Sequence, residues 1–318
     1  MEQQPEAVEK LPDKRNNGHQ RSAITPSNHS GTRGAVLGQV QAAQCSNCGA
    51  STGSNTDDAM MTNPSYVYAL GKIKHRFPSI SVEKEFAQAI GRADTAGLTD
   101  EQAFASALSE RSNRYLARHL CWVLSIADLD TYILQPNDPA DYDLLIEAIR
   151  PEPSTDDVDV IIGIRGPLAP AAMCNGLVVP IVVFDQIYSF NTISLVKSIP
   201  RPEAISPEAF ERASDGLFRR IIQLTDNAGA TDEHRALNYL AVRYPRIYER
   251  IAQAYADVQS LTEVEVRPSR LSGVRNVVDA IFSYTHRETA VTEKWFVRVD
   301  VTEEFPFLVT GLQPFFDR

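Results

Sequence analysis

The chain has 318 residues and a mass of 35.2 kDa, which is room for one large domain or two ordinary ones. Hydrophobic residues make up 43% and charged residues 23%, a globular composition that excludes a wholly disordered or fibrous chain. The 31 basic and 41 acidic residues leave a formal charge of −10, and no local run supplies the basic excess that a nucleic-acid binder needs.

The sequence shows no sign of export or membrane insertion. Four cysteines in a chain of this length do not make a disulfide framework, and no charged and apolar leader opens it. The longest apolar stretch, residues 177–184, is far shorter than the roughly 20 residues of a membrane helix. We therefore expect a cytoplasmic protein without a membrane segment.

Composition changes abruptly near residue 66. All 26 aromatic residues lie at or after Tyr66, whereas residues 1–65 are rich in Pro, Gly, Ser, Asn, Gln and Thr. Such a stretch buries too little apolar surface to offset its ordering entropy, so it predicts a disordered linker or tail over residues 1–65. A long linker also leads us to expect another domain upstream.

Residues 66–199 mix strand and helix patterns and are expected to form a first α+β subdomain. Apolar periodicity predicts helices over 81–90 and from Asp100, the second opened by a capping box of Thr99 and Gln102. Continuous or alternating apolar runs predict strands over 66–70, 121–124, 131–134, 158–164 and 178–184. Pro180 marks the last of these as an edge strand or a bulge.

Residues 200–318 are expected to form a second subdomain of helices followed by a β-hairpin. Helix starts are predicted at Ser206-Pro207, Thr231 and Pro245. Strict alternation over 291–301 predicts a half-buried strand, paired with a strand over 274–286. The predicted fold class is therefore α+β, with mixed helices and mostly antiparallel strands.

No recognised catalytic signature is present, and the sharpest local feature is a cysteine pair. Cys45 and Cys48 have the spacing of two zinc ligands, but a second pair is missing. His19, His29 or a second copy of the chain would have to complete the site. The alternative is two reduced thiols in a linker. Cys121 and Cys174 could join His119 in a second site, but the preferred interpretation is that they are buried apolar side chains of the core.

Four consecutive residues at a predicted helix start combine two acids, an imidazole and a guanidinium: Asp232, Glu233, His234 and Arg235. Groups like these perform acid–base chemistry, but acids in a first turn also favour the helix dipole without any function. No nucleophile accompanies them, so they are weighed as catalytic candidates against a structural role.

The C-terminal region offers a second set of candidates. Arg267, Arg270 and Arg275 carry guanidinium groups suited to a peptide carboxylate, the alternative being a solvated face with ion pairs. Apolar residues near the end of the chain need cover, either from the domain itself or from a partner. We expect the centre of a homodimer interface at Phe305, Phe307, Phe315 and Phe316.

Several long segments together resemble one known family. They are VEKEFAQAIGR (82–92), DVDVIIGIRGP (157–167), GLVVPIVVFDQIYSF (176–190), NAGATDEHRALNYLAVRYP (227–245), VEVRPSRLSGVR (264–275) and EKWFVRVDVTEEFPFLVT (293–310). The chain from about Tyr66 to Arg318 is similar to the C-terminal domain of unknown function of PatG-type cyanobactin maturation proteases.

The resemblance implies a place in a pathway. In that family a subtilisin-like protease domain cleaves a precursor peptide and joins its ends, but the motifs that carry the protease triad are absent here. We expect a non-catalytic accessory domain that scaffolds the protease or the precursor peptide. The alternatives are an enzyme that uses Asp232, Glu233, His234 and Arg235, with zinc as a candidate cofactor, and a purely structural dimerisation module.

Overall fold

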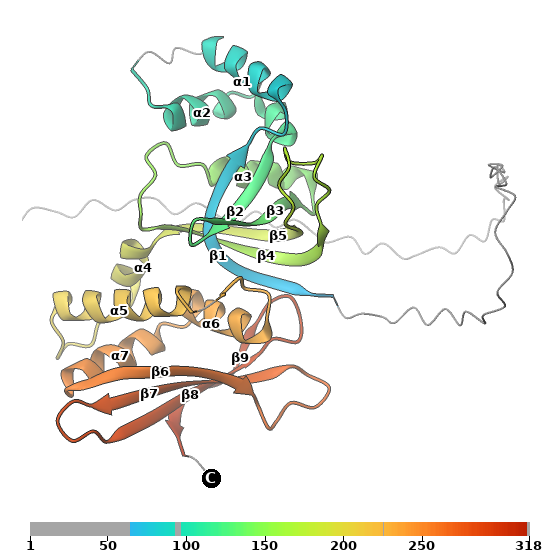
Figure 1. The fold of residues 1–318 in the computed structure, drawn as a ribbon. Coiled ribbons are helices and arrows are strands. Elements are labelled where there is room, and N and C mark those ends of the chain that lie inside the picture. The colour runs from blue at the N-terminus through green and yellow to red at the C-terminus, as the bar shows by residue number, and fades with distance from the viewer. Residues whose placement is uncertain (1–63, 93–96, 225, 317–318) are drawn as a thin grey trace, which may run out of the picture. The chain divides into compact units, whose positions relative to one another are not determined.

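The computed structural model describes residues 64–92, 97–224 and 226–316, which belong to one compact unit (Figure 1). Almost all of the predicted linker, including Cys45 and Cys48, lies outside the described residues. The predicted α+β class is confirmed: helices accompany two separate sheets, and all strand pairs but one are antiparallel.

The first sheet is a closed barrel with the strand order β1-β2-β3-β5-β4. Its strands are β1 (Tyr66–Arg76), β2 (Cys121–Ile126), β3 (Leu129–Pro136), β4 (Asp157–Leu168) and β5 (Pro180–Asn191). Only β3 and β5 run parallel. Because side chains alternate along a strand, Val67, Leu124, Ile161 and Phe184 belong to one core cluster while Tyr68 and Val160 belong to another.

Short helices accompany the barrel strands. They are α1 (Ile80–Arg92), α2 (Asp100–Ser109), η1 (Arg114–His119), η2 (Pro139–Asp141), α3 (Tyr142–Glu147) and α4 (Thr192–Ser198). The predicted capping box is confirmed, with Thr99 and Gln102 exchanging both hydrogen bonds at the start of α2. Phe86 of α1 and Phe104 of α2 are buried in the cluster that also fills the barrel.

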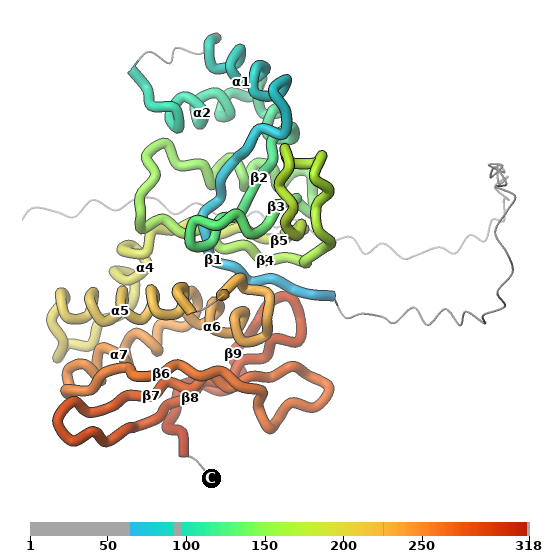
Figure 2. The backbone as a smooth tube through the Cα atoms, in the orientation of Figure 1, coloured from blue at the N-terminus to red at the C-terminus, as the bar shows by residue number. Residues whose placement is uncertain are grey.

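The second half of the described chain places helices α5 (Pro207–Ile222), α6 (Asp232–Arg243) and α7 (Arg246–Ala256) between the barrel and a second sheet (Figure 2). This sheet has the order β6-β7-β8-β9, formed by Gln259–Pro268, Val277–His286, Thr292–Asp300 and Phe307–Phe315. One core cluster runs from Val160 of the barrel through Leu240 of α6 to Phe282 of the sheet. The two halves therefore share buried apolar surface.

The predicted C-terminal hairpin is wrong in extent. The predicted pair is present as β7 and β8, but it forms the centre of a four-stranded sheet. The outer strands were not predicted. β6 carries only a short strand signal, in which Val264 and Val266 alternate with charged residues, and Gly311 and Pro314 lie within β9 and weaken its pattern.

Two further expectations need comment. Of the two alternatives predicted for Pro180, the edge strand is wrong, because β5 pairs with β3 and with β4, whereas the bulge agrees with the register shift in β4 beside Pro180, the first residue of β5. Cys121 and Cys174 are buried in the core as predicted, but they are joined in a disulfide and are not separate thiols. The bond ties β2 to the connection between β4 and β5.

Strand β1 changes partner along its length. Residues from Tyr66 to Gly71 pair with β4, whereas residues from Lys72 to Arg76 pair with β2. Gly71 is at the crossing point, where a Cβ atom would lie 2.4 Å from the carbonyl oxygen of Ser125. Each half of β1 consequently has one edge that no barrel strand occupies.

A loop from the second half of the chain fills the first of these edges. The Tyr68 N–H donates to the Gly229 carbonyl at 2.9 Å, and the Asn238 side chain donates to the Tyr68 carbonyl at 2.8 Å. Asn227 and Asn238 exchange amide hydrogen bonds of 2.8 and 3.1 Å. The NAGATDEH segment therefore docks α6 onto the barrel.

Gly229 is the residue of this loop that tolerates no side chain. Its φ of +71° disfavours other residues, and a Cβ atom would lie 2.4 Å from the Tyr68 carbonyl oxygen. We predict that Gly229→Ala lowers the free energy of unfolding by roughly 2–4 kcal/mol, measured by chemical denaturation. The matched control is Gly216→Ala in α5, where the new methyl group meets nothing within 4 Å and stability should stay equal or rise slightly. Equal effects of the two changes would contradict the docking role.

Candidate functional site

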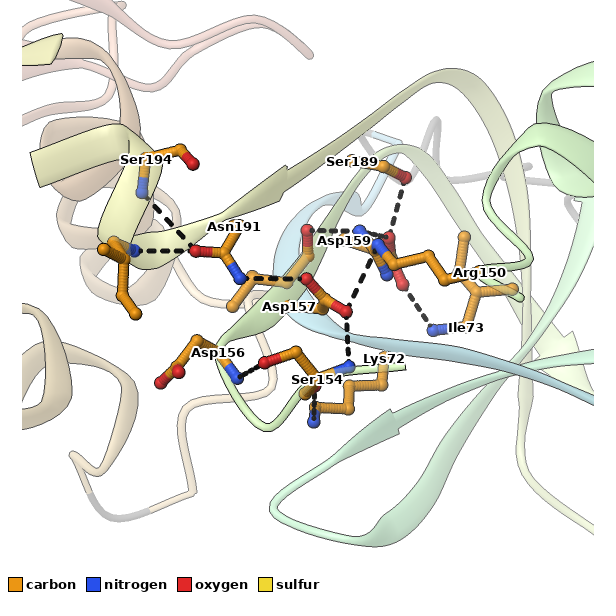
Figure 3. Close-up of polar contacts among 12 residues, drawn as sticks. Lys72, Ile73, Arg150, Ser154, Asp156, Asp157, Asp159, Ser189, Asn191 and Ser194 are labelled. Atoms are coloured by element: carbon orange, nitrogen blue, oxygen red, sulfur yellow. Dashed lines mark hydrogen bonds and ion pairs between the residues drawn. The ribbon is translucent and has the colours of Figure 1, made fainter. Parts of the chain in front are cut away.

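The second unoccupied edge of β1 is filled only at its start, by a buried carboxylate. Asp159 is 1% exposed, and its Oδ2 accepts a hydrogen bond of 2.7 Å from the Ile73 backbone N–H (Figure 3). Its Oδ1 accepts from Arg150 at 3.0 Å and from the Ser189 hydroxyl at 2.7 Å. Asp159 thus replaces a strand carbonyl where β1 separates from β4.

The polar network continues to Asp157, two residues earlier in β4. Its carboxylate accepts from the Ser154 N–H at 2.7 Å and from the Asn191 amide at 3.1 Å, and Arg150 Nε lies 3.6 Å away. Burial alone would raise the pKa of Asp157, but these hydrogen bonds and the charges of Arg150 and Lys72 outweigh it and lower the pKa. Asp157 is therefore held ionised.

Two clefts adjoin this network, and Lys72 and Asp157 line both. The first, which we call the α5 cleft, has a volume of about 340 Å³. Its apolar part comes from Leu70, Val158 and Phe218, and its polar part includes the ion-paired Arg219 and Asp215. The α5 cleft therefore lies between the barrel and α5, and the Arg219 and Asp215 side chains in its lining are paired with each other.

The second cleft, which we call the β1 cleft, has a volume of about 370 Å³. It is lined by four consecutive β1 residues, Lys72 to His75, so it runs along the edge of the strand. The opposite wall comes from α2 and from the segment after α3, and includes Phe104 and Ile149. The His75 ring stacks on Phe104 with centroids 3.7 Å apart, and burial lowers the pKa of His75.

The sequence-predicted cluster at the start of α6 is only partly assembled. Asp232 and Arg235 line a polar pocket of about 310 Å³ with Tyr66 and Glu303, whereas Glu233 and His234 do not line it. Arg235 is 3% exposed and donates to the backbone carbonyls of Val301 (2.7 Å), Glu303 and Glu304. Its guanidinium group therefore anchors the turn between β8 and β9.

The predicted peptide-binding arginines lie on and beside the second sheet. Arg267 of β6 covers the Phe315 ring at 4.9 Å, and Arg275 covers the Phe307 ring at 5.2 Å while pairing with Asp300. Arg270 is exposed in the loop between β6 and β7. The structure does not bring these arginines into one pocket. Phe305, Phe307 and Phe316 are exposed, which leaves the predicted dimer interface untested.

The described residues contain no group of three or more His, Cys, Asp or Glu side chains that could hold a metal ion. The zinc ligands predicted at Cys45 and Cys48 lie outside the described residues, so that prediction stands as it was made. None of the helices within 64–92, 97–224 and 226–316 is long and apolar enough to span a membrane.

Sequence reasoning missed the carboxylates at the centre of the network. A signal was present, because Asp157 precedes and Asp159 interrupts the apolar run of β4, and their spacing of two residues places both on one face of a buried strand. Buried carboxylates require partners, but the partners come from Arg150, Ser189 and Asn191, which periodicity alone does not connect to them.

The comparisons with known proteins agree with the resemblance reached from the sequence. Residues 205–315 match the family model described as PatG C-terminal. This region of the chain is therefore similar to the PatG C-terminal family. A solved structure titled "PatG Domain of Unknown Function" is similar over 79% of this chain and 99% of its own length, with a TM-score of 0.65 and 22% identity. That likeness shows the fold of nearly the whole described region. No curated protein matches the chain.

The network also makes a prediction about stability. Asp159→Asn removes the buried charge that faces Arg150 while keeping the shape of the side chain, so it leaves the half-buried guanidinium group with Asp157 as its remaining ion partner. We expect a loss of about 2–4 kcal/mol in the free energy of unfolding, measured by chemical denaturation. Asp128→Asn is the control, because Asp128 is 97% exposed and its loss should change stability by less than about 0.5 kcal/mol. A loss of that small size for Asp159→Asn would contradict the role of the network.

The turn held by Arg235 makes a prediction about pH. Burial, a hydrogen bond to Asp185 and the like charge of Asp185 raise the pKa of Glu304 to about 7, against the opposing charge of Arg235. A carboxyl group whose pKa is raised on folding stabilises the fold below its unfolded pKa and loses this effect as pH rises through the folded value. Wild-type stability should therefore fall between about pH 4.5 and pH 7 relative to Glu304→Gln, by at most about 2 kcal/mol because Glu304 is partly exposed.

The difference between the two proteins is the quantity to measure. Burial lowers the pKa values of His75 and His234, which gives both proteins a slope of opposite sign in the same pH range. This contribution cancels when the unfolding free energies of the wild type and Glu304→Gln are subtracted at each pH. A difference that is constant from pH 4 to pH 8 would show that Glu304 does not titrate in this way.

Proposed function

We propose that this chain is a non-catalytic accessory domain of cyanobactin maturation, the route to ribosomal cyclic peptides. In this proposal it works in the cytoplasm and scaffolds the subtilisin-like protease or the precursor peptide. The match of residues 205–315 to the PatG C-terminal family carries the proposal, and the fold likeness over 79% of the chain supports it. Both comparisons connect the chain to PatG without connecting it to a reaction.

The chemistry of the clefts favours binding. The charged groups between the two clefts are used by one another and by the backbone: Arg150 pairs with Asp157 and Asp159, and Asp159 accepts from the Ile73 N–H. Charged groups that are hydrogen-bonded to one another and to the backbone hold a fixed position, so they form a rigid wall between the clefts. Apolar surface beside such a wall is suited to hold a peptide segment or a protein side chain.

The alternative of an enzyme built on the α6 cluster receives less support from the geometry. Arg235 is committed to three backbone carbonyls, and His234 does not line the pocket that contains Asp232. Burial raises the pKa of Asp232 and lowers that of His234, so the two groups differ in proton affinity without sharing a pocket. These positions suit a role in docking α6 and the β8–β9 turn.

A binding titration tests the proposed function. The full chain is titrated by calorimetry with the linear precursor peptide and, separately, with the protease domain. We predict saturable binding to at least one of them at micromolar concentrations, and no change in the mass of the peptide during prolonged incubation with this chain alone. Absence of binding to both would contradict the scaffold role. Conversion of the peptide by the chain alone, lost in His234→Ala, would favour the enzyme, and a dimer without either interaction would favour the structural module.

A further inference from the structure

The open edge of β1 carries backbone groups that face the β1 cleft. The Ile73 N–H donates to Asp159, so this N–H points away from β2. Ile73 and Leu124 are therefore opposite one another without hydrogen bonds between their backbones. Because hydrogen-bonding direction alternates along a strand, the N–H and C=O of His75 also point away from β2. Among the residues that the structure describes, no strand and no carboxylate takes up the His75 groups as Asp159 takes up the Ile73 N–H.

The other half of β1 shows how such an edge is satisfied in this molecule. At Tyr68, the unoccupied edge receives the Gly229 carbonyl and the Asn238 amide, so an irregular backbone segment and a side chain complete the ladder. At Ile73 the Asp159 carboxylate provides a single acceptor. Beyond Ile73 the strand continues to Arg76 beside a cleft of about 370 Å³.

We propose that the β1 cleft binds an extended segment of the precursor peptide as an added strand along the Ile73–Arg76 edge. This inference rests on the proposed function and names the part of the molecule that performs it. Four residues of extended chain span about 13 Å, enough to pair with a short stretch of peptide. In strand addition, main-chain hydrogen bonds supply affinity, and pockets for alternate side chains supply selectivity.

The lining of the cleft defines the chemistry of the segment. Phe104, Trp122 and Ile149 provide an apolar surface for one side chain of the peptide. The charges in the lining are Lys72, Lys74 and Arg150 against Glu101, Asp157 and Asp159. Arg150 is already paired with both aspartates, whereas Lys74 has the fully exposed Asp128 at 3.8 Å as its ion partner. Glu101 is exposed at the start of α2, whereas Lys74 lies on the β1 edge itself, so an acidic residue placed beside Lys74, next to an apolar one, complements this edge of the cleft.

A pair of substitutions at His75 tests the added strand in the full chain. His75→Pro removes the ring and the outward N–H, and proline is tolerated where a strand N–H faces away from its partner. His75→Ala removes the ring alone, so the comparison isolates the N–H. We expect His75→Pro to bind the linear precursor peptide at least about tenfold more weakly than His75→Ala. Equal affinities would overturn the proposal.

Amide hydrogen exchange keeps the test decisive if the proline variant fails to fold. In the wild-type chain, saturating precursor peptide should slow exchange at His75 at least about tenfold, because the amide gains a hydrogen-bond acceptor. Unchanged exchange at His75 with peptide bound elsewhere would overturn the strand addition but leave the scaffold role. Binding to the protease domain without binding to the peptide would also overturn the strand addition and leave the scaffold role.

The charge preference has its own matched pair. Lys74→Glu reverses a charge in the cleft, and Lys84→Glu makes the same change at an exposed position of α1. The first should weaken binding of the precursor peptide several-fold, and the second should not. Equal effects would overturn the acidic preference. A dimer of the free chain that dissociates in His75→Pro would mean that a second copy occupies the edge, and would overturn the peptide assignment.

Discussion

The change of partner at Gly71 is the constraint on which the rest of the structure depends. β1 pairs with β4 up to Gly71 and with β2 after it, which closes the barrel. Each half of β1 is left with one edge that pairs with no barrel strand, and we call these the two half-edges. A side chain at Gly71 would collide with the Ser125 carbonyl, so the close approach of β2 requires glycine there. The docking of α6 and the existence of the β1 cleft both follow from this one crossing.

The two half-edges explain why the polar residues of the molecule gather where they do. Backbone groups that lose a strand neighbour must find another partner or face water. Asn238 and Gly229 serve this need on one side of β1, and Asp159 serves it on the other. Asp159 in turn requires Arg150 and Ser189, because a buried carboxylate with one hydrogen bond would be strongly destabilising. The unpaired backbone groups of β1 thus account for the position of Asp159 and, through it, of Arg150 and Ser189.

Much of the local structure could be predicted from the sequence, because periodicity and helix caps are local signals. The Thr99 capping box, the Ser206 cap and the strand alternation through Val297 and Val299 are all present as expected. Barrel closure was out of reach, because it depends on a register between β1 and β4 that lie about 90 residues apart. The candidate site could not be predicted for the same reason, because Ile73 and Asp159 meet only through that register. Asp232 to Arg235 were candidates because they are consecutive in the sequence.

The disulfide between Cys121 and Cys174 changes how the remaining cysteines of the chain are to be understood. It closes a covalent ring across 53 positions that contains β3, α3 and β4. With two of the four cysteines bonded to each other, Cys45 and Cys48 are the two thiols left to react with an alkylating reagent. In the oxidised chain, thiol labelling thus becomes a selective reporter of the N-terminal segment.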